Sequence, residues 1–375
     1  MLREISVTKF GFVIHPLKPK DVARKYPFVK YLPDALIEPV LARKRPVVAS
    51  EITGIRSITG AETSGWFVAC PLTPSQMVHK LPLELVYERI SQCADIAADL
   101  GADLIGLGAF TSVVGDGGVT IASRSRIGVT TGNSYTVATA IEGTLRAARM
   151  LDIDIPNATL AVVGATGSIG KTCARILARE FGRVLLVGRD LDRTSQVALE
   201  IPGGEATTDI SRIQEADAIV TVSSAGKELI LPEHLRPGSV VCDVARPRDV
   251  SARVMRERPD VLVIEGGVVK VPGNVEFNFN FGFPEQTAYA CMSETMILAL
   301  EGDPNLFNFT VGKEVTVEQV DTISGLAKKH GFELASFRAF ERAVSDEAVN
   351  RARKARITAR SVPRASSPGL LDVGT

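Results

Sequence analysis

Short apolar runs and amphipathic stretches alternate along the first 150 residues, which is typical of a mixed α/β fold. Apolar residues at helical spacing predict a helix over 82–100 that stops at Gly101. The stretch 16–39 is rich in proline and lysine, so we expect it to be irregular with one short helix. Strands are predicted at 9–15, 47–57, 62–71, 104–109 and 120–128. The second and third, separated by a Thr-Gly turn, are expected to form a hairpin or a pair of neighbouring strands.

From residue 157 the pattern changes to short buried strands separated by helical or polar segments. Six strands with crossovers predict a doubly wound parallel sheet, in which ligands bind beyond the carboxyl ends of the strands. The loops after these strands contain Ser223, Ser224, Ala245 and Gly267, which we expect to line the nicotinamide half of a cofactor site. The predicted strands are 160–163, 184–187, 205–207, 218–222, 239–243 and 261–265, with 192–200 and 210–215 among the segments between them.

Helical patterns dominate the remaining sequence. Pro284 suits the first turn of a helix that ends at Gly302, and one or two more helices are expected over 315–340. Beyond Asp346 the periodicity is lost, which predicts a frayed basic helix and a disordered tail. The expected organisation is an N-terminal α/β substrate domain (1–150), a Rossmann NADP-binding domain (151–275), a C-terminal helical segment (276–345) and a basic, disordered tail (346–375).

The stretch ATLAVVGATGSIGKTCARILA, residues 158–178, has the pattern of a strand, a tight turn and a helix. Gly164 allows the sharp turn, Gly167 allows the backbone to approach a pyrophosphate, and Gly170 allows helix and strand to pack closely. The helix N-terminus faces the anion. This context favours dinucleotide binding over a simple loop. The predicted binding residues are Gly164, Ala165, Thr166, Gly167, Ser168, Ile169 and Gly170.

The strand that follows ends in Gly188-Arg189-Asp190 and bears on the choice of cofactor. A guanidinium at this place suits the 2′-phosphate of NADP, whereas an acidic residue would bind the ribose hydroxyls of NAD. We favour NADPH, with Arg189 on the phosphate and adenine. Asp190 facing the ribose and Arg189 as a solvated loop residue are the alternatives.

Composition excludes several classes of function. Lys plus Arg and Asp plus Glu both number 43, so no global charge favours nucleic acid or an anionic membrane. Five widely spaced cysteines fit a reduced compartment, and no cluster of cysteines and histidines suggests a metal site. The sequence shows neither a signal peptide nor an apolar run that could span a bilayer, so we expect a cytoplasmic protein.

Six stretches occur in the order FGFVIH, LGAFTS, TTGNSYT, AVVGATGSIG, IEGGVV and AYACMSETMILALEG. This set closely resembles the cyanobacterial-type reductases of long-chain acyl groups on acyl carrier protein (acyl-ACP reductases), which form fatty aldehydes. The resemblance runs from about Phe10 to Phe337, and the cysteine-bearing helix followed by LxxEG is its most specific part. The glycine loop alone would not separate this family from glutamyl-tRNA reductases or shikimate dehydrogenases.

The resemblance implies NADPH-dependent reduction of an acyl thioester through an acyl group on Cys291. Departures from the family pattern near 18–29, in 271–283 and beyond 338 leave the acyl chain and the carrier (ACP or CoA) open. If the helix begins at Pro284, Cys291 lies two turns in, whereas a start near Ala288 would let the helix dipole stabilise the thiolate. Without the resemblance, a buried structural cysteine would be the expected role.

Other residues are assigned to this chemistry as candidates. Ser112, Thr131, Asn133 and Ser134 are candidate donors to the oxyanion. His15 is a candidate acid or base, or a structural histidine at a strand end. Glu294, one turn from Cys291, would orient a water or the thiol, or pair with a basic residue.

Two other functions remain open at this point. One is an NADP-dependent dehydrogenase of shikimate or glutamyl-tRNA reductase type, and the other is an inactive NADP-binding protein. The expected partners are an ACP or CoA thioester and an aldehyde-consuming enzyme. The basic run 351–360 would suit docking of an acidic ACP, with a solvated helix end as the alternative.

Overall fold

The computed structural model describes residues 7–24, 27–280 and 282–361. Its N-terminal sheet has the order β13-β2-β3-β1-β4-β5. Strands β1, β3, β4 and β5 are parallel, while β2 is antiparallel to both β3 and β13, which confirms the predicted hairpin. The strands are β1 (Phe10–Ile14), β2 (Val47–Arg56), β3 (Glu62–Ala69), β4 (Leu104–Leu107), β5 (Gly128–Thr130) and β13 (Gly273–Glu276).

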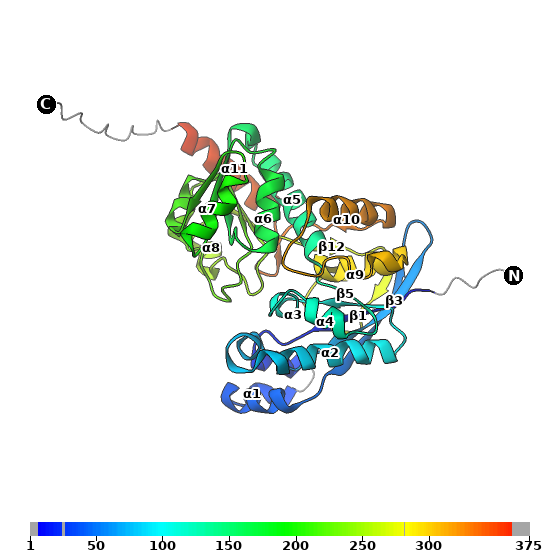
Figure 1. Ribbon diagram of the computed structural model, residues 1–375. Helices are drawn as coiled ribbons and strands as arrows, with labels where there is room; N and C mark the ends of the chain where they lie inside the picture. The colour runs from blue at the N-terminus through cyan, green and yellow to red at the C-terminus, as the bar shows by residue number, and fades with distance from the viewer. Residues whose placement is uncertain (1–6, 25–26, 281, 362–375) are drawn as a thin grey trace.

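Two helices cover opposite faces of this sheet. Helix α2 (Leu83–Asp99) buries Ile90 and Cys93 against one face, and helix α9 (Ala290–Glu301) packs Met296 and Ile297 against the other. Figure 1 shows the three layers, with α2 below the strands and α9 above them. The sheet thus holds the N-terminal end of α9 in a fixed position.

Two N-terminal segments differ from the sequence prediction. The stretch 120–128 was predicted as a strand, but helix α4 (Val119–Arg124) occupies most of it, and β5 begins only at Gly128. A short apolar run does not distinguish a strand from one helical turn, and Gly118, at a φ of 87°, starts the helix. The proline-rich stretch forms 3₁₀ turns η1 (Pro19–Arg24) and η2 (Pro27–Tyr31), and then helix α1 (Asp34–Arg43).

The second sheet is fully parallel with the order β11-β10-β9-β6-β7-β8, which confirms the doubly wound fold. Its helices α6 (Ser168–Leu177), α7 (Leu191–Leu199) and α8 (Ala252–Glu257) and the 3₁₀ turn η5 (Ile210–Glu215) lie between the strands in sequence. The strands are β6 (Thr159–Val163), β7 (Arg183–Val187), β8 (Gly204–Thr207), β9 (Ala218–Thr221), β10 (Val240–Asp243) and β11 (Leu262–Glu265).

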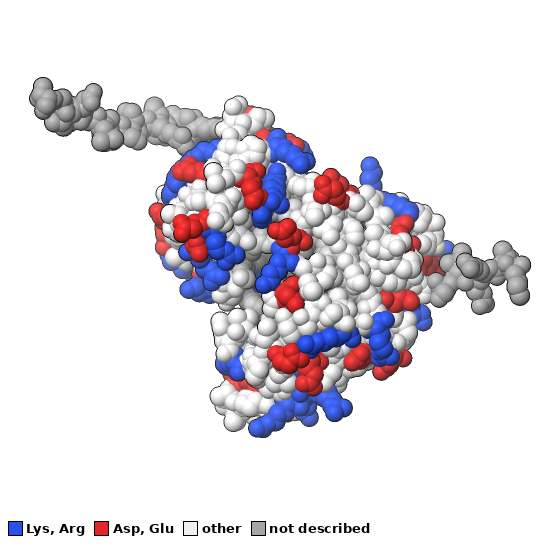
Figure 2. All heavy atoms as spheres, viewed as in Figure 1, with Lys and Arg blue, Asp and Glu red and all other residues white. Residues whose placement is uncertain are grey.

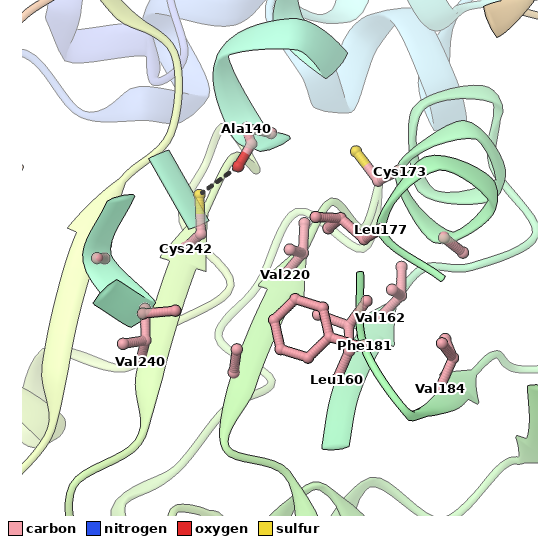
Figure 3. Close-up of a cluster of buried hydrophobic side chains, with 14 of the residues drawn as sticks. Ala140, Leu160, Val162, Cys173, Leu177, Phe181, Val184, Val220, Val240 and Cys242 are labelled. Carbon is pink, nitrogen blue, oxygen red and sulfur yellow. Dashed lines mark hydrogen bonds between the residues drawn. The ribbon is translucent and has the colours of Figure 1, made fainter. Parts of the chain in front are cut away.

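A buried apolar cluster holds α6 and α5 (Asn133–Met150) against this sheet. Cys173, Leu177 and Phe181 lie over Leu160 and Val220 in Figure 3. In the same cluster, the Cys242 thiol donates a 3.9 Å hydrogen bond to the Ala140 carbonyl. Both cysteines are fully buried, so they are core residues.

The region after the parallel sheet is not purely helical. Strands β12 (Val268–Lys270), β14 (Thr287–Tyr289) and β15 (Glu333–Leu334) form a small antiparallel sheet. The expected start of a helix at Pro284 is therefore wrong, because the chain turns there and pairs as β14 before α9 begins at Ala290. Helix α10 (Val317–His330) packs on α5 and α9, and the short strands β16 (Arg338–Ala339) and β17 (Arg342–Ala343) follow.

The last described helix is α11 (Asp346–Ser361), which is packed on the second sheet rather than frayed. Val349 and Ala352 are buried in the cluster of Figure 3, and the guanidinium of Arg356 donates to Asp217 Oδ1 at 2.9 Å. Residues 362–375 of the predicted tail lie outside the described residues.

The surface carries both signs of charge. Figure 2 shows acidic and basic side chains intermixed over one face, in line with the equal numbers of each in the sequence. Among the described helices, none is long and apolar enough to cross a membrane.

Candidate active site

A cleft of about 940 Å³ is lined by residues of both sheets. Ser223, Ser224, Ala245 and Gly267, at the carboxyl edge of the parallel sheet, form part of its wall, as does Ile169 at the start of α6. The structure thus brings together the predicted nicotinamide-side residues. The predicted chemical residues His15, Ser112, Asn133 and Cys291 line the same cleft.

The part of the cleft formed by the N-terminal half is largely apolar. It includes side chains from β1, from the segment with η1, η2 and α1, and from the chain after β13. Large apolar residues in its wall are Phe12, Leu17, Phe28, Leu32, Leu36, Ile37, Val40, Leu41, Phe110 and Phe279. Such a surface suits a long apolar ligand.

Cys291 is the second residue of α9, so of the two starts considered from the sequence, the later one is right and the thiol lies in the first turn. Cys291 is half-buried, whereas the other four cysteines are fully buried. One of these four, Cys70, also borders the cleft. Gly132, at a φ of 73°, lies directly against it, because a Cβ there would be 2.4 Å from the Cα of Cys291. The loop before α5 thus reaches the thiol.

Burial and nearby dipoles act in opposite directions on this thiol. Burial raises the pKa of Cys291 to about 12, and the charge of Glu294 adds to the rise. The backbone N–H groups of Met292, Cys291 and Ala109 lower the pKa, because they stabilise the thiolate. The effect of burial is the larger, so the resting side chain is a neutral thiol.

Glu294 is fully buried and is held by four donors. The Ser134 hydroxyl and the Tyr135 N–H donate to Oε2 at 2.6 and 2.9 Å. The Thr130 hydroxyl donates to Oε1 at 2.6 Å, and the Thr310 hydroxyl donates to the same oxygen. Glu294 therefore ties α9 to the loop before α5, and it is not among the residues that line the cleft.

His15 has a backbone partner on each ring nitrogen. Nε2 accepts from the Phe110 N–H at 3.1 Å, so the proton lies on Nδ1, which is 3.2 Å from the Pro16 carbonyl. Burial lowers the pKa of His15 to about 4, which keeps the ring neutral. These contacts fit the structural alternative, since neither nitrogen is turned toward the cleft with a free lone pair.

Three of the four candidate oxyanion donors are hydroxyls, and all three donate elsewhere. Ser112 donates to the Ala109 carbonyl, Thr131 to the Thr310 carbonyl, and Ser134 to Glu294. Asn133 is buried in the cleft wall, and within the described residues no hydrogen bond of its side-chain amide is found. Asn133 is thus the candidate side chain that keeps donors for a ligand.

The glycine loop has the shape expected of a phosphate cradle. Gly164 has a φ of 85°, and a Cβ at Gly170 would lie 2.3 Å from the Gly164 carbonyl oxygen. Above Gly167 the space is open, because a Cβ there would meet nothing closer than 3.4 Å. These residues therefore fit a dinucleotide, and Thr166, Gly167 and Ser168 line a second, small hollow of about 60 Å³.

In the turn after β7, Gly188, Arg189 and Asp190 have three different roles. Gly188 is required for packing, since a Cβ would lie 2.1 Å from Thr194 Oγ1. Asp190 caps α7 by accepting from the Arg193 N–H at 3.1 Å. Arg189 is exposed and has no ion pair or hydrogen bond within the described part of the chain. This leaves the Arg189 guanidinium available to a phosphate.

The contacts and conformations of two cleft residues, Arg246 and Ala109, were not predicted from the sequence. Arg246 places its guanidinium over the Tyr289 ring, 5.4 Å from the ring centroid, and Tyr289 is the N-cap residue of α9. Ala109 has a φ of 47°, a value that alanine rarely adopts. No local pattern marks either residue, because their contacts join segments far apart in the sequence.

Residues 146–265 match the family model described as shikimate / quinate 5-dehydrogenase. A relative from Serratia sp., named aminotransferase PigE, is 30% identical over 340 residues, covering 86% of this chain but 39% of PigE. A long-chain acyl-[acyl-carrier-protein] reductase from Synechococcus elongatus is 28% identical over 343 residues, covering 86% of this chain and 98% of the reductase. The chain thus spans well under half of PigE but nearly all of the reductase.

Similar solved structures include L-tryptophan dehydrogenase from Nostoc punctiforme, with 13% identity, a TM-score of 0.42, and coverage of 94% of this chain and 89% of that one. Glutamyl-tRNA reductase from Methanopyrus kandleri has 26% identity, a TM-score of 0.29, and coverage of 48% and 46%. The sequence matches relate the chain to oxidoreductases and identify its glycine-rich half as an NAD(P)-binding domain of dehydrogenase type.

Proposed function

We propose that this protein reduces a fatty acyl thioester to the aldehyde with NADPH, through an acyl group carried on Cys291. The observation that carries the proposal is the position of the Cys291 thiol. It lies in the wall of a cleft that is apolar on one side and bordered by the nucleotide-binding edge on the other. The similarity to an acyl-ACP reductase over nearly its whole length supports the same reaction.

The chain's own residues account for binding and orientation. The apolar wall holds the acyl chain, and the first turn of α9 places N–H dipoles at the Cys291 sulfur. Glu294 acts as a positioning residue that fixes α9 against the Gly132–Asn133 loop. The glycine loop and Arg189 hold NADPH, which supplies the hydride when bound. A thioester on Cys291 keeps the acyl group activated for that reduction.

A shikimate-type dehydrogenase is the second candidate, because residues 146–265 match that family. That match covers the nucleotide-binding half alone. A small polyol would leave the large apolar wall of the cleft, with Phe28, Leu36 and Phe279, without a matching ligand surface. We therefore favour the acyl substrate, carried by ACP or CoA, with an aldehyde-consuming enzyme as the next partner.

Covalent labelling tests the proposal. Incubation with a long-chain acyl-CoA and no NADPH should add one acyl mass, mapped by peptide mass spectrometry to Cys291, and NADPH should release it as aldehyde. Cys291→Ser should neither label nor turn over. Cys70→Ser and Cys173→Ser, which replace fully buried thiols, should do both if the fold is kept. Aldehyde formation by Cys291→Ser at a near-normal rate would show that reduction does not pass through this residue.

A further inference from the structure

The turn that joins β4 to the short helix α3 (Phe110–Val113) is strained at one residue of the cleft wall. Ala109, at the N-cap of α3, has a φ of 47° and a ψ of −120°. Backbone conformations of this kind are unfavourable for an L-residue, and they persist where surrounding contacts fix them. Ala109 lies in the wall of the cleft that contains Cys291.

Three side chains hold this turn in place. His15 accepts the Phe110 N–H, the Thr111 hydroxyl donates to the Gly108 carbonyl at 2.7 Å, and the Ser112 hydroxyl donates to the Ala109 carbonyl at 2.7 Å. The low pKa of His15, about 4, results from burial, so the ring remains a neutral acceptor at neutral pH. His15 and Ser112, which the sequence analysis proposed for catalysis, thus both stabilise this turn.

The same turn lies beside the first turn of α9. Gly106 of β4 touches that helix so closely that a Cβ would lie 2.0 Å from Thr295 Oγ1. Thr295 lies one turn after Cys291 in α9 and donates to its carbonyl at 3.3 Å, so β4 packs directly against the beginning of this helix. The chain then continues from Gly106 to Ala109, which lines the same cleft as Cys291 and whose backbone contributes to lowering the pKa of that thiol.

We propose that the Ala109 N–H is an oxyanion donor for acyl transfer to Cys291, and that His15 and Ser112 are positioning residues for it. The inference rests on the proposed function. When the Cys291 thiolate attacks the thioester carbon, an S–C bond forms and the C=O π pair moves to oxygen. The oxyanion develops next to the sulfur, in the part of the cleft wall that Ala109 and Cys291 both line. The carbonyl re-forms as the bond to the carrier sulfur breaks. The carrier leaves as thiolate and takes up a proton from solvent, which balances the proton that the Cys291 thiol released to solvent before the attack.

The N–H itself can be removed by an amide-to-ester replacement. L-Lactate in place of Ala109 keeps the methyl side chain and the backbone shape but has no N–H. We expect the single-turnover rate of Cys291 acylation at saturating acyl-CoA to fall about a hundredfold, with little change in substrate affinity. The matched control is the corresponding ester at Val114, which removes the N–H that donates to the Phe110 carbonyl within α3. It should leave the acylation rate unchanged.

His15 provides a second test, with a conservative variant. His15→Gln retains an acceptor for the Phe110 N–H but cannot act as acid or base, so it should keep most of the acylation rate and the wild-type pH profile. His15→Leu removes the acceptor and should slow acylation without raising KM. If His15→Gln is as slow as His15→Leu while both remain folded, the positioning role is wrong and proton transfer by His15 is supported.

The outcomes separate the inference from the function on which it rests. If the wild-type protein forms no acyl group on Cys291, the proposed function fails. If the wild type is acylated and the Ala109 ester reacts equally fast, the oxyanion role alone is overturned. If the Ala109 and Val114 esters are slowed to the same extent, the effect comes from the integrity of the turn rather than from the donor, and the proposal is again wrong.

Discussion

The Cys291 thiol shows how one residue's environment sets its reactivity. Because burial holds its pKa near 12, the thiolate is a small fraction of the protein at neutral pH, and that fraction rises about tenfold for each pH unit. We expect alkylation of Cys291 by iodoacetamide to accelerate by roughly this factor per unit between pH 7 and 9. The alkylation rate is measured by peptide mass spectrometry of the Cys291 peptide. A rate already level at pH 7 would contradict a neutral resting thiol.

Glu294 leads to a stability prediction at the same scale. Glu294→Gln keeps the shape but places an NH₂ donor where the hydroxyls of Thr130, Ser134 and Thr310 and the Tyr135 N–H all donate. We expect the free energy of unfolding to fall by about 1–3 kcal/mol, measured by chemical denaturation. The exposed Glu285→Gln is the matched control and should change little. Equal effects of the two substitutions would exclude a structural role for the buried carboxylate.

Several residues that the sequence analysis proposed for chemistry have structural contacts instead. His15, Ser112 and Ser134 were candidate acids, bases or oxyanion donors, yet each is bound to the backbone or to Glu294. The partners of His15 and Ser134 lie 95 and 160 positions away, so no local pattern could reveal them. Cys291 was proposed as the nucleophile through the resemblance alone, since its immediate sequence is also that of an ordinary apolar helix.

At the scale of elements, the β7–α7 turn controls the choice of cofactor in the proposed function. Arg189 is exposed, while Asp190 is engaged as a helix cap. Arg189→Ala should therefore weaken NADPH by about 1.5–3 kcal/mol, the value of a charge-assisted hydrogen bond, and leave NADH nearly unchanged. Apparent KM values for the two cofactors measure this, and Arg193→Ala, an exposed arginine one turn along, is the control. Equal use of NADPH and NADH by the wild type would refute the assignment.

Element prediction succeeded where several signals agreed and failed where one stood alone. All six strands of the parallel sheet were predicted, because apolar runs, glycines and intervening helices repeat in the same order. The stretch 120–128 and the helix start at Pro284 each depended on one local feature. Proline favours the first turn of a helix, but after Pro284 the chain pairs with β12 as strand β14, so no helix starts there. That difference moved Cys291 into the first turn of α9.

At the scale of the whole molecule, distant segments complete each half. Strand β13 closes the edge of the N-terminal sheet more than 200 residues after β2. Helix α11 covers the second sheet, with Arg353 donating to the Met150 carbonyl at 2.6 Å and Arg356 to Asp217. Two arginines of the run considered for ACP docking are thus used inside the fold. A linear division of the sequence could not foresee either contact, because both depend on chain reversal over long distances.

The docking of α11 can be tested with two glycines of similar backbone conformation. Gly238 and Gly226 have φ values of 72° and 67°, so alanine at either pays the left-handed cost of about 1–2 kcal/mol. A Cβ at Gly238 would lie 2.3 Å from the Cβ of Arg356, whereas nothing lies within 4 Å at Gly226. Gly238→Ala should therefore lower the free energy of unfolding by about 1–3 kcal/mol more than Gly226→Ala. It should also raise amide hydrogen exchange in α11. If the two variants lose the same stability and α11 stays protected in both, the close packing of α11 on this sheet is wrong.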